Sequence, residues 1–371
     1  MRIAVLKETA AGETRVAASA ETVRKFIALG ASVAVEAGAG LNAAIADADY
    51  AAAGAEVSTD PAKGADIVLG VQGPDVAALK GANPGAWIVA GLDPFGQRAR
   101  VDAYAKAGFE ALAMEFMPRI TRAQSMDILS SQSNLSGYKA VIEAANAYGR
   151  AFPMMMTAAG TVSAAKAFVM GVGVAGLQAI ATARRLGAQV SATDVRSATK
   201  EQIMSLGAKP VFVENVAGIE GEGAGGYATE MSAEYQAAQA ELVSAHIAKQ
   251  DIVITTALIP GRAAPRLVSD AQLASMKAGS VVFDLAVAQG GNVEGSVADE
   301  VVIRHGVKII GWSNTPAHLA ADASALFARN LYNFLSAFWD KDAGKPVLDD
   351  EIGNAVRLTQ GGKVVHERLL G

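Results

Sequence analysis

The stretch Gly171-Val172-Gly173-Val174-Ala175-Gly176 decides the fold, because the residues around it place a three-glycine turn between a strand and a helix. The apolar run 167–170 predicts a strand, and the periodic run 177–186 predicts a helix. A second predicted strand, 189–193, ends at Asp194. Strand, glycine turn, helix, strand and acid in this order predict a dinucleotide-binding unit.

Each glycine of this turn is expected to play a separate role. Gly171 makes the tight turn, Gly173 lets backbone approach a pyrophosphate, and Gly176 lets the helix pack on the strand. The pyrophosphate would lie at the positive end of the helix dipole. Asp194 can accept hydrogen bonds from both adenosine ribose hydroxyls and would repel a 2′-phosphate, which favours NAD(H). Arg196 is close by and could instead bind a 2′-phosphate, so NADP(H) stays the alternative. The other interpretation is an ordinary tight turn.

Composition limits the class of protein. The 371 residues suggest two domains, and 51% hydrophobic with 19% charged residues is typical of a soluble globular α/β protein. A net charge of −5 without a long basic run disfavours a nucleic-acid surface. The lack of cysteine excludes disulfides, thiolate metal sites and thiol catalysis. We expect no signal peptide, no membrane span and an intracellular location.

Strand and helix patterns alternate along the chain, which predicts parallel sheets with right-handed crossovers. Besides those around the glycine turn, strands are expected at 2–6, 32–36, 66–71, 87–90, 111–115, 209–212, 252–255, 281–285 and 307–311, and helices at 20–29, 101–107, 138–148 and 320–338. The predicted fold is α/β, with two doubly wound Rossmann-like domains whose mostly parallel sheets are linked by long helices. Residues 1–130 plus 319–371 would form a discontinuous first domain, and 131–318 the NAD(H)-binding Rossmann domain.

A polar segment, 119–132, falls between a predicted strand and a long helix, near the expected domain junction. Arg119 and Arg122 could meet a pyrophosphate, Gln124 has a donor and an acceptor suited to a carboxamide, and Asp127 could orient either group. The alternative is a loop whose Ser and Asp side chains cap the following helix. Spacing alone does not separate the two interpretations.

A third segment, 218–227, has five glycines in nine residues and ends at Tyr227. Such a stretch can hardly hold one conformation in the free protein. It predicts a mobile lid that closes on bound nucleotide with Tyr227 at its tip. A plain flexible linker is an equally weighted alternative.

The distribution of histidine separates two kinds of chemistry. The four histidines are His246, His305, His318 and His366, so the first 245 residues contain none. An NAD enzyme that oxidises an alcohol or an amino acid must move a proton as well as a hydride, and usually positions a His, Lys or Tyr for it. Hydride transfer between two nicotinamides requires no such group. This argument disfavours an ordinary dehydrogenase.

Four segments, 119–134, 153–161, 171–183 and 255–261, closely resemble the NAD(H)-binding component of proton-translocating transhydrogenases, in its split bacterial form. The resemblance covers nearly the whole chain. It implies that Arg119, Gln124 and Asp127 act at the site of hydride transfer. It also implies that the glycine turn and Asp194 contact the nucleotide. Further contacts are implied for Ser130, Val174, Val195, Arg196, Gly226, Tyr227, Ala257 and Leu258.

The alanine dehydrogenases share this fold and are the serious competitor. The chain keeps that family's early arginine as Arg15, but Gln72 stands where the resemblance places a substrate-binding lysine. The segment 87–97, which would carry the catalytic histidine, contains none. Two small departures from the transhydrogenase pattern, Met170 and Ala288-Gln289, touch no named contact.

The resemblance therefore implies an enzyme component that binds NAD(H) and no metal, and docks on an NADP(H)-binding domain carried by membrane partners. Hydride would pass directly between the two nicotinamides, coupled to proton translocation through the membrane subunits. We expect a homodimer, peripherally attached through its partners to the cytoplasmic face of the inner membrane. The alternatives are an alanine dehydrogenase-like oxidoreductase and a non-catalytic NAD-sensing module.

Overall fold

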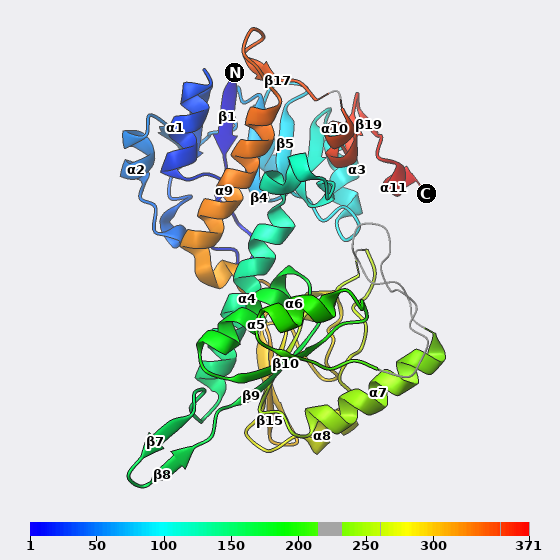
Figure 1. Ribbon diagram of the computed structural model, residues 1–371. Coiled ribbons are helices and arrows are strands. Elements are labelled where there is room, and N and C mark those ends of the chain that lie inside the picture. Colours follow the sequence, from blue (N-terminus) through cyan, green and yellow to red (C-terminus); the bar gives the residue numbers. More distant parts are fainter. Residues whose placement is uncertain (214–231, 260, 349, 371) are drawn as a thin grey trace. The chain divides into compact units, whose positions relative to one another are not determined.

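The computed structural model describes residues 1–213, 232–259, 261–348 and 350–370, and the chain divides into two compact units (Figure 1). Unit 1 comprises Met1–Gln132 and Ala317–Gly371, and unit 2 comprises Ser133–Pro316. The expected boundaries were after residues 130 and 318. The chain passes between the units within helix α4 (Ile128–Ala147), and again in the 3-10 helix η6 (Thr315–Leu319).

Unit 1 is built on a six-stranded sheet in the order β3-β2-β1-β4-β5-β6, with every neighbouring pair parallel. Its strands are β1 (Arg2–Val5), β2 (Ser32–Glu36), β3 (Glu56–Ser58), β4 (Ile67–Gln72), β5 (Trp87–Gly91) and β6 (Glu110–Ala113). This is a doubly wound order, in which β1 and β4 are the neighbours at which the direction of winding reverses. Ligands of such sheets bind at the carboxyl ends of that pair.

Helices cover this sheet because each buries one apolar face. In α1 (Ala20–Ala28) a capping box between Ser19 and Thr22 starts the helix, and Val23 and Phe26 are buried. The long helix α9 (Ala320–Ala337) buries Phe327, Leu331 and Phe334 in the same core. The remaining elements of unit 1 are η1 (Leu41–Ala43), α2 (Asp47–Ala52), η2 (Val76–Leu79), α3 (Arg98–Lys106), η3 (Met114–Phe116), η4 (Thr121–Met126), β16 (Trp339–Asp340), β17 (Lys345–Pro346), α10 (Glu351–Val356), β18 (Thr359–Gln360), β19 (Lys363–Val364) and α11 (Glu367–Leu370).

Unit 2 repeats the doubly wound plan in a seven-stranded sheet ordered β11-β10-β9-β12-β13-β15-β14. Its strands are β9 (Lys166–Met170), β10 (Gln189–Thr193), β11 (Lys209–Pro210), β12 (Ile252–Thr255), β13 (Val281–Asp284), β14 (Glu300–Arg304) and β15 (Val307–Gly311), of which only β14 is antiparallel to its neighbour. The other elements are α5 (Val174–Arg185), α6 (Thr199–Ser205), α7 (Ala233–Ile247), α8 (Asp270–Ser275), η5 (Val287–Gln289) and a hairpin of β7 (Met155–Thr157) with β8 (Gly160–Val162). The predicted α/β class, with two doubly wound and mostly parallel sheets, is confirmed.

Several predicted elements have different bounds. The helix expected at 138–148 begins ten residues earlier, at Ile128, because the Asp127 carboxylate accepts a hydrogen bond from the backbone N–H of Ser130 at 3.0 Å and caps it. The helix expected at 101–107 begins at Arg98, and the strand expected at 209–212 ends at Pro210. Strand β14 was not predicted, because its side chains are mostly exposed and show no buried alternation.

Charged side chains that are buried or half-buried lie at the reversal point of the unit 1 sheet. Glu8 follows β1, and its carboxylate accepts hydrogen bonds from the N–H groups of Val71 (2.6 Å) and Gln72 (3.4 Å) in β4. Next to it, Glu13 accepts hydrogen bonds from the side chains of Arg15 (2.6 Å) and Gln72 (2.9 Å). Arg15 also donates to Gln132 at 2.9 Å. Arg15, which matches the alanine dehydrogenase pattern, and Gln72, which departs from it, therefore both donate hydrogen bonds to the Glu13 carboxylate.

The two glutamates titrate in opposite directions. Burial raises the pKa of Glu8 to about 7, opposed by the Val71 N–H and reinforced by the negative charge of Glu13. Burial also disfavours the charge of Glu13, but the hydrogen bonds and charge of Arg15 outweigh it and hold the pKa of Glu13 at about 2. Unit 1 thus contains a carboxyl group that titrates near neutrality, which the sequence did not predict.

Glu8→Gln is expected to make stability less dependent on pH. A raised native pKa contributes stability that is full below the unfolded pKa and is lost as the pH rises through the native pKa. Between pH 5 and pH 8 the free energy of unfolding of the wild type should therefore fall relative to Glu8→Gln by about 2–3 kcal/mol. Denaturant titrations of both proteins across this range measure the difference. Parallel profiles would mean that Glu8 has an ordinary pKa.

Candidate dinucleotide site

The glycine turn of unit 2 has the geometry that its sequence predicts. Gly171 has φ +99°, and a Cβ there would lie 2.5 Å from the Thr256 hydroxyl. A Cβ at Gly176 would lie 1.9 Å from the Gly171 carbonyl oxygen, so helix α5 touches the end of β9 directly. Gly173, which precedes α5, is exposed and has open space where a side chain would stand. Two glycines are needed for packing, and the middle one leaves room for a ligand.

Asp194 lies at the end of β10, and only 8% of its surface is exposed. Its carboxylate accepts hydrogen bonds from Val172 N–H (2.7 Å) in the glycine turn and from Arg196 Nε (2.9 Å) and Nη2 (2.9 Å). Burial raises the pKa of Asp194, but the Arg196 side chain and these N–H donors outweigh it, and the net shift is downward. The acid is therefore ionised and fixed beside the turn, and Arg196 is paired with it.

Backbone from two further elements approaches this turn. Gly137 of α4 lies so close to α5 that a Cβ there would be 2.0 Å from the Ala175 carbonyl oxygen. After β12, Thr256 donates its hydroxyl to the Gly171 carbonyl at 3.0 Å. Ala257 follows and is partly buried, and Leu258 is 40% exposed. Gly171, Gly173, Val174, Gly176, Asp194, Val195, Arg196, Ala257 and Leu258 thus lie around the carboxyl ends of β9, β10 and β12.

Four further predicted residues, Arg119, Gln124, Asp127 and Ser130, are in unit 1. Arg119 lies just before η4 and Gln124 lies on it, and both side chains are exposed. The backbone of η4 is held by α9, because Asn330 and Asn333 both donate side-chain hydrogen bonds to the Ser125 carbonyl at 2.9 and 3.0 Å. Gln124 is therefore an exposed side chain on a fixed backbone.

The Ser130 hydroxyl donates a hydrogen bond to the Asp127 carboxylate at 2.5 Å. The capping role left open by the sequence is thus present, and it still leaves acceptor capacity on the carboxylate. Arg122 pairs with Asp350 and stacks over Phe338, with 5.7 Å between its guanidinium carbon and the ring centre. Arg122, which the sequence also suggested as a pyrophosphate ligand, is therefore already paired with a carboxylate. Gly226 and Tyr227, with the predicted lid, lie outside the described residues.

Sequence reasoning missed Gly137 and Asn292. Asn292 is fully buried and accepts a hydrogen bond from Ala257 N–H at 3.1 Å. Both act through contacts with residues far away in the sequence, so no local pattern marks them. The sequence marks Asn292 only by its place. It follows a pair of glycines, after a buried strand that ends at Asp284.

The site fits a dinucleotide by its donors and acceptors. The first N–H groups of α5 can bind a pyrophosphate, open space lies over Gly173, and the ionised Asp194 can accept from ribose hydroxyls. Within the described residues no three His, Cys, Asp or Glu side chains are placed to hold a metal ion. No helix in that portion of the chain is long and apolar enough to cross a membrane.

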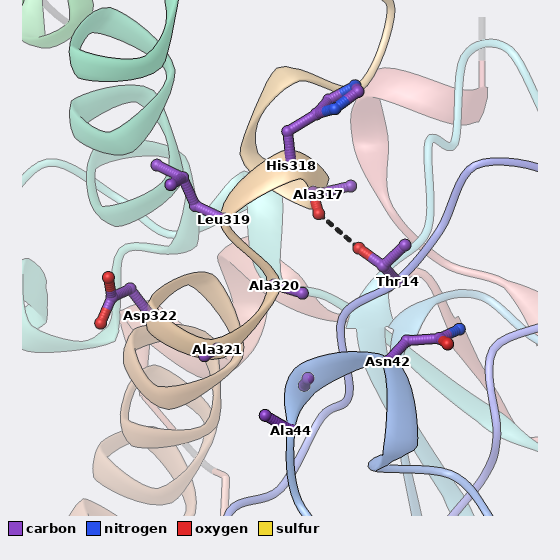
Figure 2. Close-up of a pocket in the computed structure, with 10 residues that line it drawn as sticks. Thr14, Asn42, Ala44, Ala317, His318, Leu319, Ala320, Ala321 and Asp322 are labelled. Carbon is purple, nitrogen blue, oxygen red and sulfur yellow. Dashed lines mark hydrogen bonds between the residues drawn. The ribbon is translucent and has the colours of Figure 1, made fainter. Parts of the chain in front are cut away.

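The histidines have partners elsewhere. His246 contacts the Ser191 hydroxyl at 2.8 Å, His305 pairs with Asp270 at 2.9 Å, and His366 contacts the Ala355 carbonyl at 3.0 Å. His318 lines a pocket of about 420 Å³ in unit 1, at the start of α9 (Figure 2). None of the predicted site residues lines that pocket.

Comparison with known proteins shows the family. Two family models match, "Alanine dehydrogenase/PNT, N-terminal domain" over residues 4–136 and "Alanine dehydrogenase/PNT, C-terminal domain" over residues 140–367. The chain is 52% identical to the first portion of the NAD(P) transhydrogenase alpha subunit of Rhodospirillum rubrum, covering 100% of this chain and 99% of that protein. The alanine dehydrogenase of Halomonas elongata is 27% identical over 100% of this chain and 96% of that protein.

A solved structure agrees with this grouping. The crystal structure of transhydrogenase from Sinorhizobium meliloti superimposes with a TM-score of 0.90 at 55% identity, covering 98% of this chain and 100% of that one. The transhydrogenase relatives are thus much more similar to this chain than the dehydrogenase is. The chain therefore belongs to the alanine dehydrogenase/PNT family and, within it, to the alpha subunits of NAD(P) transhydrogenase, which confirms the family and the enzyme class expected from its sequence.

Proposed function

We propose that this chain is the NAD(H)-binding component of a proton-translocating transhydrogenase. Hydride passes directly between NADH on this chain and NADP⁺ held on a partner domain, and membrane subunits couple the transfer to proton translocation. The observation that carries the proposal is the glycine turn with its ionised Asp194, in a chain in which His246, His305 and His366 pair elsewhere. The site residues that the structure describes bind and orient and include no His, Lys or Tyr, which suits hydride exchange between two nicotinamides.

Unit 2 supplies the binding surface. The N–H groups at the start of α5 hold the pyrophosphate, and the open space at Gly173 admits it. Asp194 accepts from the adenosine ribose while Arg196 balances its charge. A 2′-phosphate would place two negative charges beside the buried carboxylate, which disfavours NADP(H) on this chain.

Residues of unit 1 that the resemblance to the transhydrogenases implies at the nucleotide are proposed to orient the nicotinamide. Gln124 can pair its amide with the carboxamide, and its backbone is fixed by Asn330 and Asn333. Arg119 carries a positive charge for the phosphate, and Asp127 with Ser130 forms a bonded pair that presents oxygen acceptors. These residues position and bind, and positioning alone can account for a large share of the rate of a hydride transfer.

The partner domain also determines where the chain works. We infer that membrane partners hold it at the cytoplasmic face of the inner membrane, because direct hydride transfer requires contact with the NADP(H)-binding domain that they carry. NADP(H) belongs to the partner domain.

Two assays test the proposal against its alternatives. In the first, pyruvate and ammonium are offered to the isolated chain with NADH. In the second, NADH oxidation is followed after the NADP(H)-binding partner and NADP⁺ are added. We expect no reaction in the first and transhydrogenation in the second. Turnover in the first indicates an alanine dehydrogenase, and NADH binding without turnover in either indicates a sensing module.

Asp194→Ala is expected to weaken NADH binding by about 1–3 kcal/mol, because hydrogen bonds to a buried ligand are lost and Arg196 loses the carboxylate that balances its charge. Asp270→Ala is the control, since it removes a carboxylate that pairs with Arg304 elsewhere in unit 2. Equilibrium titration with NADH and NADPH measures both variants. If the wild type binds NADPH as tightly as NADH, the role assigned to Asp194 is wrong.

Gln124→Asn shortens the side chain by one methylene and should misplace the nicotinamide. Because a displacement of about 1 Å can cost on the order of 10²-fold in rate, hydride transfer should fall much more than NADH affinity. Gln124 is exposed, so the fold should be unaffected. Gln360→Asn, at another exposed glutamine of unit 1, is the control. Equal losses of rate and affinity would reduce Gln124 to a binding residue.

The hairpin β7–β8 supports the proposed homodimer. It belongs to neither large sheet, and Figure 1 shows it extending from the rest of unit 2. Met154, Met155 and Met156 are 63%, 44% and 80% exposed, and an isolated two-stranded hairpin is marginal in water. Sedimentation should give twice the mass of the chain, and replacing the three methionines with serine should give a monomer. A monomeric wild type would contradict the dimer.

A further inference from the structure

Asn292 uses its whole side-chain amide to hold one short segment of backbone. It is fully buried and follows β13. Its Oδ1 accepts from Ala257 N–H at 3.1 Å, and its Nδ2 donates to the carbonyl oxygens of Ala257 (2.9 Å) and Pro265 (2.8 Å). Both N–H groups and the carbonyl of the asparagine side chain are therefore engaged.

These bonds engage both backbone polar groups of Ala257. Its N–H has no further hydrogen to donate, so what Ala257 can still offer a ligand is its methyl group, its Cα and the second lone pair of its carbonyl oxygen. The preceding residue is fixed as well, because Thr256 N–H donates to Met170 at 2.9 Å and its hydroxyl donates to Gly171 at 3.0 Å. The backbone after β12 is thus tied to the glycine turn on one side and to Asn292 on the other.

Asp284 holds Asn292 in turn. This carboxylate ends β13, is fully buried, and accepts from the N–H groups of Ala286 (3.0 Å), Asn292 (3.2 Å) and Val293 (3.2 Å). Gly291 has φ +78°, and a Cβ there would lie 2.7 Å from the Asp284 carboxylate. The chain therefore turns tightly around the acid, which leaves Asn292 little freedom.

The held segment lies where the sheet of unit 2 reverses its winding. Strands β9 and β12 are neighbours there, and β13 is next to β12. Ligands of doubly wound sheets bind at the carboxyl ends of that pair. We infer that Asn292 is a positioning residue of the nucleotide site, which makes Ala257 a fixed apolar wall for the dinucleotide; this rests on the proposed function.

The test replaces the amide with an apolar group of similar size. In Asn292→Leu both polar groups of Ala257 lose their partner, so the wall should move to find new ones. We expect the Kd for NADH to rise roughly tenfold to a hundredfold. Asn292→Ser keeps a hydroxyl that can meet one of the three partners without burying a charge, so its Kd should rise less. It also serves if Asn292→Leu does not fold.

Gln272→Leu is the matched control. Gln272 is also buried in unit 2 and donates to Ser244 at 2.9 Å, but it joins α7 to α8. We expect it to lower the melting temperature like the Asn292 variants while leaving the Kd for NADH unchanged. Folded Asn292 variants with the wild-type Kd, or an equal rise of the Kd in Gln272→Leu, would overturn the inference.

The proposed function and this inference fail in different ways. If the wild type does not bind NADH, the proposed function fails. Hydrogen exchange at the Ala257 amide then still tests the structural half, because the amide should be protected in the wild type and exchange faster in Asn292→Leu. Unchanged exchange would show that Asn292 does not hold the segment.

Discussion

The contact between Gly176 and the carbonyl oxygen of Gly171 is the constraint on which the site depends. A single methyl group at Gly176 would fall 1.9 Å from that oxygen, so only glycine lets α5 start directly against the end of β9. The same oxygen accepts the Thr256 hydroxyl, which ties β12 to the turn. The N-terminus of α5, the ionised Asp194 and the Ala257 wall are thereby brought around one point, where the winding of the sheet reverses.

The chemistry follows from what this arrangement contains. Donors, an ionised acid and an apolar wall can hold and orient a dinucleotide, but they do not transfer a proton. In unit 1 the reversal point is filled by the bonds among Glu13, Arg15 and Gln72, where an alanine dehydrogenase pattern would have a lysine. Glu8 does titrate near neutrality, but its carboxylate is engaged with β4 backbone. This pattern supports hydride exchange over amino-acid oxidation.

The sequence predicted those parts of the structure that neighbouring residues determine, namely the glycine turn and the buried strands. The glycine spacing and Asp194 marked the dinucleotide unit, and apolar runs such as 252–255 marked buried strands. Asn292 and Gly137 were missed because their roles come from residues 35 and 38 positions away, Ala257 and Ala175. The start of α4 was placed ten residues too late because the polar run 130–134 shows no apolar periodicity, although a cap in this segment was one of the two interpretations. The pKa of Glu8 depends on burial, which only the folded chain creates.

Isotopic labelling can show whether hydride passes directly between the two bound nicotinamides. NADH deuterated at the transferred position of C4 would be incubated with this chain, its NADP(H)-binding partner and NADP⁺. We expect the deuterium to be recovered in NADPH and none to reach the water, because in direct transfer no protein group or solvent carries the hydride. Deuterium released to water, or NADPH formed without the label, would contradict direct transfer.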